Sequence, residues 1–314
     1  MFDLPKNKIH SEKDWLNEIA KIKKEVNKKS IISNEKKAIE LVKKSILIAF
    51  EKRIPDEKFG ILFSGGVDST LLAFLAKQKK LNFTCYLSVL DCDDLADPHD
   101  LERAISASKE LNLDLKIKKT SLDELAKILP QVIKIINRKD PVHIGIATAL
   151  WQAISEVKKD NLKYFLTGLG TEQIYAGGNK YYKTNNINKL CWEQLGKIAW
   201  QGDILRDLAL EKHSGLKMLV PFFSQETILA GMQINSSLKN SPSEIVSGSI
   251  SQGKNSHQKY ILRKVAENLG LSKELAWRRT RPTQYGSQFD KGLEKLAKKN
   301  GFKYKKEYLD FLSL

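Results

Sequence analysis

The sequence lacks long apolar runs and contains few cysteines. None of its 314 residues lies in an apolar stretch approaching the ~20 residues of a membrane-spanning helix. The N-terminal segment also lacks the apolar core of a signal peptide. The three cysteines, Cys85, Cys92 and Cys191, form no CxxC pair and no zinc-binding spacing. We therefore expect a cytoplasmic protein with reduced thiols and no membrane contact.

Arginine is scarce as well, because only eight of the 53 basic residues are arginine. The net charge of +16 indicates an anionic partner such as RNA, but widely spread lysines favour an ordinary solvated surface. The densest lysine cluster, residues 291–308, is the one segment for which we still consider an anionic partner. Four of the eight arginines lie between Arg263 and Arg281. This clustering favours bidentate recognition of phosphate or carboxylate.

Short apolar segments alternate with helical patterns along the middle of the chain. This alternation predicts parallel βαβ units, and therefore an α/β fold with a doubly wound parallel sheet. Two amphipathic helices are expected before it. Beyond residue 188 the pattern is helical, with no further alternating strand, and the Ser-rich stretch 235–258 is expected to be a loop. The expected strands are residues 59–64, 82–90, 114–121 and 163–170.

The stretch FSGGVDST, residues 63–70, lies between an expected strand and an expected helix. Gly65 and Gly66 allow backbone amides to approach a ligand, and the helix start supplies N–H groups and a positive dipole end. Asp68 would repel a phosphate unless a divalent cation lay between them, so Mg²⁺ is implied. Neither the Walker lysine nor a GxGxxG pattern is present. Three hydroxyl groups add donors: Ser64, Ser69 and Thr70.

This stretch resembles the pyrophosphate-binding loop of the ATP pyrophosphatases, or PP-loop enzymes. Three later stretches are similar, in order, to motifs of the synthetase domain of asparagine synthetases and β-lactam synthetase. YFLTGLGTEQIYAGG is similar to S-G-E-G-S-D-E-L/V-F-G-G. DILRDLALEKHSGLKMLVPFF is similar to a D-x-x-R segment ending in R-x-P-F-L-D. KYILRKVAENLG and RRTRPTQYGS are similar to K-x-x-L-R and R-x-K elements. The resemblance covers about residues 36–290.

The resemblance implies an ATP-dependent, AMP-forming ligase of amino-acid biosynthesis. A small-molecule carboxylate would attack the α-phosphate of ATP, pyrophosphate would leave, and ammonia or an amine would attack the acyl-adenylate. The implied domains are an N-terminal helical extension, a PP-loop ATP-binding core and a helical region that completes the active site. Their expected boundaries are residues 1–35, 36–187 and 188–314.

Carried over by position, the resemblance assigns roles to individual residues. Those expected to hold the pyrophosphate end of ATP are Ser64, Gly65, Gly66, Asp68, Ser69 and Thr70. Leu62 and Val89 would contact adenine, and Gly168 would lie by the ribose or the substrate. Mg²⁺ would be bound by Asp68 and Glu172. Glu172 is also assigned to the catalytic residues, together with Lys259 and Arg281 from the K-x-x-L-R and R-x-K elements. Arg263 would bind the nucleotide.

The chain differs from the family pattern at residues that would act in the second half of the reaction, in which the acceptor is used. Leu169 replaces the catalytic glutamate, and Ser224 replaces an acidic residue. The catalytic lysine is replaced by Arg281 or Thr280, depending on the register of the match. Arginine keeps its charge and stabilises an oxyanion, but it does not shuttle protons. Only ~35 residues precede the resemblance, so we expect no N-terminal glutaminase domain. Free ammonia, an amine or a separate glutaminase subunit would then supply nitrogen, and a homodimer stays open.

Two other functions stay open from the sequence. A tRNA-modifying PP-loop enzyme would use the basic C-terminal segment to bind RNA. It is disfavoured by the missing cysteine pairs of its sulfur-transferring members. A non-catalytic ATP-binding partner module is motivated by Leu169, because a leucine side chain neither accepts a proton nor holds an amine.

Overall fold

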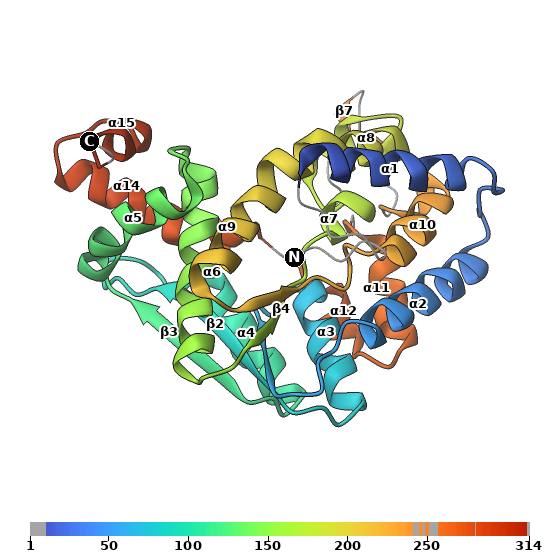
Figure 1. Ribbon diagram of the computed structural model, residues 1–314, viewed down its shortest axis with the longest axis horizontal. Helices are drawn as coiled ribbons and strands as arrows, with labels where there is room; N and C mark the ends of the chain where they lie inside the picture. Colours follow the sequence, from blue (N-terminus) through green and yellow to red (C-terminus); the bar gives the residue numbers. More distant parts are fainter. Residues whose placement is uncertain (1–10, 241–244, 247–248, 251–256, 280, 313–314) are drawn as a thin grey trace. The chain divides into compact units, whose positions relative to one another are not determined.

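The structure, a computed structural model, describes residues 11–240, 245–246, 249–250, 257–279 and 281–312 (Figure 1). Their contacts divide the chain into two compact units, each built from three separate segments. Unit 1 contains Met1–Ile54, Thr167–Asp203 and Leu219–Arg279. Unit 2 contains Pro55–Leu166, Ile204–Met218 and Thr280–Leu314. Half of the Ser-rich stretch that was expected to be a loop lies outside the described residues. Its described part contains two short strands, β6 (Ile245–Val246) and β7 (Ser249–Ile250), which pair antiparallel, so the expectation of a loop is wrong there.

Unit 2 is built on a parallel sheet whose central strands are apolar and buried. The sheet has the order β3-β2-β1-β4-β5. Strand β1 pairs in parallel with β2 and with β4, and β2 pairs in parallel with β3. The strands are β1 (Phe59–Leu62), β2 (Phe83–Leu90), β3 (Leu115–Thr120), β4 (Tyr164–Leu166) and β5 (Lys217–Leu219). The first four occupy the segments expected to be strands.

Strand β5 contradicts the expectation that no strand follows residue 188. It has only three residues and occupies the edge of the sheet, next to β4. Its first residue, Lys217, is exposed. Three residues are too few to show the alternation of apolar and polar residues by which a strand is predicted, so no sign of β5 is present in the sequence.

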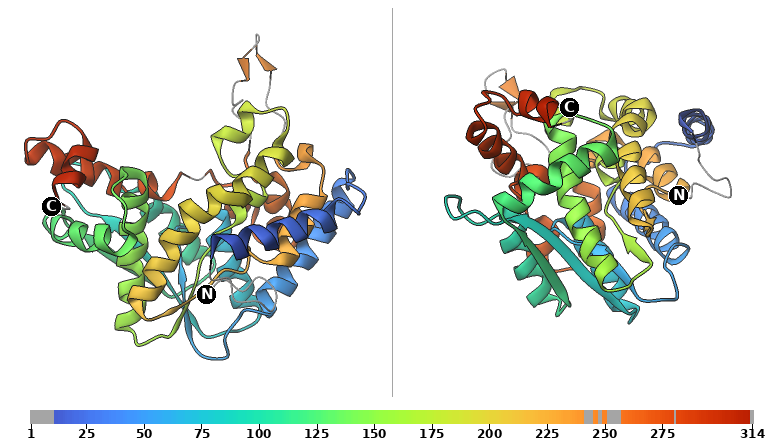
Figure 2. Two further views of the ribbon diagram at one scale, coloured as in Figure 1. Left: turned by 45° about the horizontal axis from the view of Figure 1, so that its top comes forward. Right: turned by 60° about the vertical axis from the view of Figure 1, so that its left-hand side comes forward.

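Helices cover both faces of this sheet, so the predicted doubly wound α/β fold is confirmed. Helix α3 (Val67–Gln78) contacts β1, and α4 (His99–Glu110) contacts β2 and β3. Helix α6 (Pro141–Lys159) lies against the other face, as the right-hand view of Figure 2 shows. A Cβ atom on Gly60 of β1 would lie 2.9 Å from Val157 of α6, so this contact is close. The remaining helices of unit 2 are α5 (Leu122–Ile136), α9 (Leu205–Ser214), α13 (Thr283–Gly286), α14 (Phe289–Lys299) and α15 (Lys305–Phe311).

Unit 1 is mainly helical, and its N-terminal helices form as the sequence predicts. Helix α1 buries the apolar face predicted for it, and Asn34 caps α2. Trp15 of α1 donates its indole N–H to the carbonyl of Leu195 at 2.8 Å and meets Phe223 edge-to-face. Helix α10 contacts both α1 and α2, and α11 contacts α2 (Figure 1). The helices are α1 (Glu12–Val26), α2 (Glu35–Glu51), α7 (Thr171–Ile174), α8 (Ile187–Glu193), α10 (Gln225–Gln233), α11 (Tyr260–Asn268) and α12 (Lys273–Trp277).

Within the part of the chain that the structure describes, no helix combines the length and the apolar composition that crossing a membrane requires.

Candidate functional site

The glycine loop predicted to bind phosphate lies at the carboxyl end of β1, where the strand order reverses. The chain runs outward from β1 through β2 to β3, and β4 then pairs on the opposite side of β1. Ligands of doubly wound sheets bind beyond the carboxyl ends of the strands at such a reversal. The topology therefore favours the same position that the sequence motif indicated.

Gly65 occupies a conformation and a space that exclude a side chain. Its φ of 68° is in the left-handed region that favours glycine. A Cβ atom there would lie 2.6 Å from the backbone nitrogen of Ala104 and the backbone carbon of Arg103. These are backbone atoms of α4, so no rotamer change would relieve the overlap. Gly66 is the N-cap of α3, so no capping side chain lies between a ligand and the first N–H groups of that helix.

Hydroxyl groups shape the loop from within. The Ser64 N–H donates to Ser69 Oγ at 3.3 Å, and the Gly66 N–H donates to Ser64 Oγ at 3.4 Å. Ser69 Oγ in turn donates to the Gly66 carbonyl at 3.3 Å. Thr70 Oγ1 is buried without a hydrogen-bond partner among the described residues. A buried polar atom of this kind indicates a missing partner, and a bound anion or metal complex would fit.

The two residues predicted to contact adenine are buried near the ends of their strands. Leu62 is the last residue of β1, and Val89 is the penultimate residue of β2. Both belong to unit 2, as does the whole glycine loop. Their contact with a nucleotide stays a prediction.

Helix α4 carries a buried carboxyl group, Asp100, that the sequence analysis missed. Asp100 is only 3% exposed, and burial raises the pKa of its carboxyl to about 7, although the charges of Arg103 and Arg281 lower it in part. A Cβ atom on Gly286 would lie 2.5 Å from Asp100 Cγ, so this carboxyl packs directly on the Gly286 backbone. Helix α4 therefore contacts both the glycine loop, at Gly65, and the segment that carries Arg281. The stretch DPHDLER gave a helix start as its only sequence signal.

In unit 1 the structure brings Glu172 and Lys259 together. Glu172 is exposed in the first turn of α7, and Lys259 is the N-cap of α11. Lys259 is 8% exposed, and its Nζ donates to Thr171 Oγ1 at 3.0 Å. Both side chains pack on Gly177, because a Cβ atom there would lie 2.8 Å from Glu172 Cγ and would overlap the Lys259 side chain. Thr171 is a further residue of this cluster that sequence reasoning did not identify.

Gly168 and Leu169 lie in the loop between β4 and α7, in the same unit as this cluster. The N–H of Leu169 donates to Thr167 Oγ1 at 3.2 Å, which fixes the start of the loop. Ser224, which stands where the family pattern has an acidic residue, is the fully buried N-cap of α10 and shares a capping box with Thr227. At this position the chain thus has a helix cap in place of a charge.

Arg263 is 3% exposed, and its guanidinium holds backbone carbonyls. Its Nη1 donates to the carbonyls of Ala276 at 2.7 Å and Arg278 at 2.9 Å, and its Nε donates to Gln258 at 2.7 Å. These bonds tie α11 to the end of α12. A contact of Arg263 with nucleotide stays a prediction.

The described residues contain no group of three or more His, Cys, Asp or Glu side chains placed to hold a metal ion. Asp68 and Glu172, predicted as Mg²⁺ ligands, belong to unit 2 and unit 1 respectively. Each sits in the first turn of a helix that begins after a glycine. Magnesium binding by these carboxylates stays a prediction.

The parallel sheet, its reversal of strand order and the glycine loop after β1 define an α/β protein with a phosphate-binding loop. Residues 42–211 match the family described as Asparagine synthase, and these residues are more than half of the chain. The chain belongs to the asparagine synthase family, which confirms the resemblance found in its motifs.

Curated relatives agree with this assignment. The Methanocaldococcus jannaschii protein named "Putative asparagine synthetase (glutamine-hydrolyzing) 1" is 30% identical over 282 residues, covering 82% of this chain and 51% of that protein. "Asparagine synthetase (glutamine-hydrolyzing) 1" of Lotus japonicus is 26% identical over 232 residues, covering 70% of this chain and 38% of that protein. The chain thus spans about half the length, or less, of these relatives.

Solved structures show only a distant likeness. The NH3-dependent NAD synthetase from Campylobacter jejuni aligns with a TM-score of 0.38 at 17% identity, covering 90% of this chain and 94% of that chain. NMN synthetase from Francisella tularensis aligns with a TM-score of 0.37 at 13% identity, covering 97% and 94%. TM-scores this low support no conclusion about fold or function.

Proposed function

We propose that this protein is an ATP-dependent, AMP-forming amide or C–N ligase. The observation that carries the proposal is the glycine loop after β1, followed by Asp68, in a chain of the asparagine synthase family. A loop of this kind, without a Walker lysine, suits pyrophosphate as the leaving group. The substrate would be a small carboxylate, and the nitrogen donor would be ammonia or an amine.

The proposed reaction has two steps. A carboxylate oxygen attacks the α-phosphorus of ATP, the bond to the bridging oxygen breaks, and pyrophosphate leaves with that electron pair. Backbone N–H groups of Gly65, Gly66 and the first turn of α3 hold the departing phosphates. Mg²⁺ bound by Asp68 and Glu172 would supply positive charge to these phosphates. The guanidinium of Arg281 would stabilise charge that develops during the transfer.

In the second step, nitrogen attacks the acyl carbon of the acyl-adenylate and AMP leaves. The attacking nitrogen must lose a proton, and Leu169 has no group to accept it. We therefore propose that the acceptor of this enzyme differs from that of a typical asparagine synthetase. Lys259, held by Thr171, is the cationic side chain of unit 1 that we propose to act in this step.

We further propose a cytoplasmic enzyme that receives nitrogen as free ammonia or an amine, or from a separate glutaminase subunit. The three free cysteines support a reducing compartment. The basic C-terminal segment gives little support to RNA binding, because most of its lysines are paired with carboxylates. These pairs are Lys295–Asp94, Lys298–Glu294, Lys299–Asp123, Lys305–Asp290 and Lys306–Asp310.

An ATP–pyrophosphate exchange screen over amino acids and small carboxylates tests the proposal. We expect one acid to support exchange, and Asp68→Asn to lower the rate about 100-fold, because a lost metal contact costs about 3 kcal/mol in the transition state. Asp56→Asn is the matched control, since Asp56 is exposed at the amino end of β1. The screen is repeated with a glutaminase and glutamine.

Two results would replace the proposal with another function. ATP binding without exchange for any acid, in wild type and Asp68→Asn alike, would identify a binding module. Co-purified tRNA that dissociates with rising salt would favour the tRNA-modifying alternative.

A further inference from the structure

A cavity of about 650 Å³ lies in unit 2 among α5, α6 and α9, and none of its lining residues belongs to the site described above. The three helices contact one another (Figure 1), and each contributes residues to the lining of the cavity. Its volume falls within the range of roughly 300–1,000 Å³ that small-molecule sites occupy. The cavity is therefore large enough for a ligand of about drug size.

The inner wall of this cavity is apolar. Ile135 of α5 is 7% exposed and Ile154 of α6 is 2% exposed. Trp151, one turn before Ile154, is part-exposed and adds an aromatic surface. An indole at the edge of an aliphatic cavity suits a flat, apolar ligand body, because aromatic rings combine a large contact area with specific stacking geometry.

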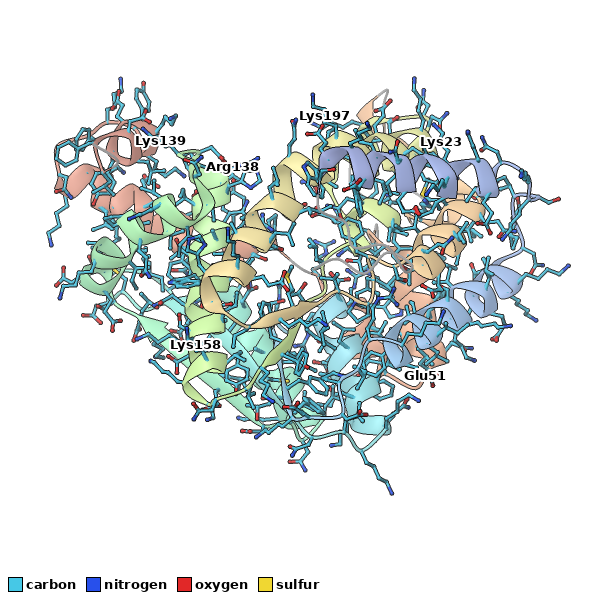
Figure 3. The ribbon with its side chains drawn as sticks, viewed as in Figure 1. Lys23, Glu51, Arg138, Lys139, Lys158 and Lys197 are labelled. Atoms are coloured by element: carbon cyan, nitrogen blue, oxygen red, sulfur yellow. The ribbon has the colours of Figure 1, made fainter. Side chains whose placement is uncertain are left out.

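The rim of the cavity is basic. Lys134, Lys158, Lys159 and His213 line it, and no acidic residue does. Lys158 lies on the lower part of α6 in Figure 3. Its Nζ donates to the Ser214 carbonyl at 2.9 Å, and Lys159 pairs with Glu156 at 2.7 Å.

Lys134 and His213 keep hydrogen-bonding capacity for a ligand. Lys134 makes no ion pair or side-chain hydrogen bond within the residues that the structure describes. His213 uses Nδ1 to donate to the Ala209 carbonyl at 2.9 Å, which leaves Nε2 for another partner. The carboxylates of α9 are engaged elsewhere, because Asp207 pairs with Arg206 and Glu211 accepts the Met218 N–H at 3.1 Å. The local charge therefore favours an anion.

We propose that this cavity binds an amphipathic aromatic anion. Its flat apolar body would lie against Trp151 and Ile154, and its carboxylate or phosphate head would lie at Lys134. The site does not depend on the proposed ligase activity, because none of these residues belongs to the glycine loop or to the Glu172–Lys259 cluster.

Two fluorescent probes of matched shape test the proposal on the full chain. 8-Anilinonaphthalene-1-sulfonate carries the anion, and N-phenyl-1-naphthylamine is its neutral analogue. We expect the sulfonate to bind more tightly, and Lys134→Ala to weaken its binding about fivefold without changing that of the neutral probe, as one part-exposed charge pair predicts. Lys127→Ala, on an exposed part of α5 outside the cavity, is the matched control and should bind both probes normally.

A second variant tests the cavity itself. Ser155→Trp places a large side chain at a lining position that is only part-buried, so both probes should lose binding while circular dichroism stays unchanged. Displacement of the sulfonate by indole-3-acetate or by 1-naphthyl phosphate distinguishes a carboxylate head from a phosphate head. Equal affinity for the two probes, unaltered binding in both Lys134→Ala and Ser155→Trp, or no binding by the wild type would overturn the proposal.

Discussion

The buried carboxyl group of Asp100 makes the stability of unit 2 depend on pH in a specific way. Its pKa is raised from 3.8 to about 7 because the charged form is costly in this buried position. In the unfolded chain the group ionises near its ordinary pKa, and in the folded chain it stays protonated to a higher pH. Between these two pKa values, folding therefore requires Asp100 either to bind a proton or to keep its charge in a buried position.

The sign follows from which state binds the proton. Below about pH 4 both states are protonated, and the group has no effect on the free energy of unfolding. From there to about pH 7 the folded state is progressively destabilised, and above pH 7 the loss is constant. A difference of about three pH units corresponds to roughly 4 kcal/mol. Asp100→Asn removes the ionisable group and should remove this pH dependence.

Urea unfolding of protein labelled with 5-fluorotryptophan measures the stability of unit 2 separately from that of unit 1. Trp151 is the only tryptophan within the segments of unit 2, so its fluorine resonance reports the unfolding of that unit. We expect the stability of Asp100→Asn relative to wild type to rise from pH 4 to pH 7 by roughly 4 kcal/mol. Asp97→Asn, an exposed neighbour, should show no such trend. A stability difference that is the same at pH 5 and pH 8 would refute the reasoning.

Three further substitutions test the close contacts. Gly65→Ala should abolish ATP binding by calorimetry while the fold persists by circular dichroism, because its Cβ would overlap the backbone of α4; normal binding would contradict this geometry. Gly177→Ala should displace Lys259, so pyrophosphate exchange should fall more than tenfold with ATP affinity retained; Gly215→Ala, which meets no atom within 4 Å, should keep full exchange although its left-handed φ of 74° costs it some stability. Ser224→Ala should cost about 1 kcal/mol in chemical unfolding as a lost helix cap, and an unchanged midpoint would argue against that role.

Local sequence patterns were enough to predict most of the sheet and the helices of both units. The strands β1 and β2 are apolar runs of four and eight residues, and β3 alternates apolar and lysine residues at its start, so all three gave a clear signal. The three-residue strand β5 gave none. Its place in the sheet is set by the helix before it and by pairing at the sheet edge, which no local pattern contains.

The glycine loop was predictable because its chemistry is contained in eight consecutive residues. The cluster around Asp100 was not, because it forms between a helix start and a glycine 186 positions later in the chain. Lys259 was found through its motif, but its bond to Thr171 joins residues 88 positions apart. Contacts of this kind depend on the tertiary packing, so a single sequence gives no direct evidence for them.

The division of each unit over three separated segments has a consequence for synthesis on the ribosome. Unit 1 needs a segment that ends at Arg279, and unit 2 needs the segment from Thr280 onward. Neither unit has all of its contacts until its last segment has been made, and β1 emerges well before β4, which covers its second edge. Such intermediates expose strand edges and are prone to aggregate. We therefore expect the yield of folded protein to depend on chaperones and on translation speed.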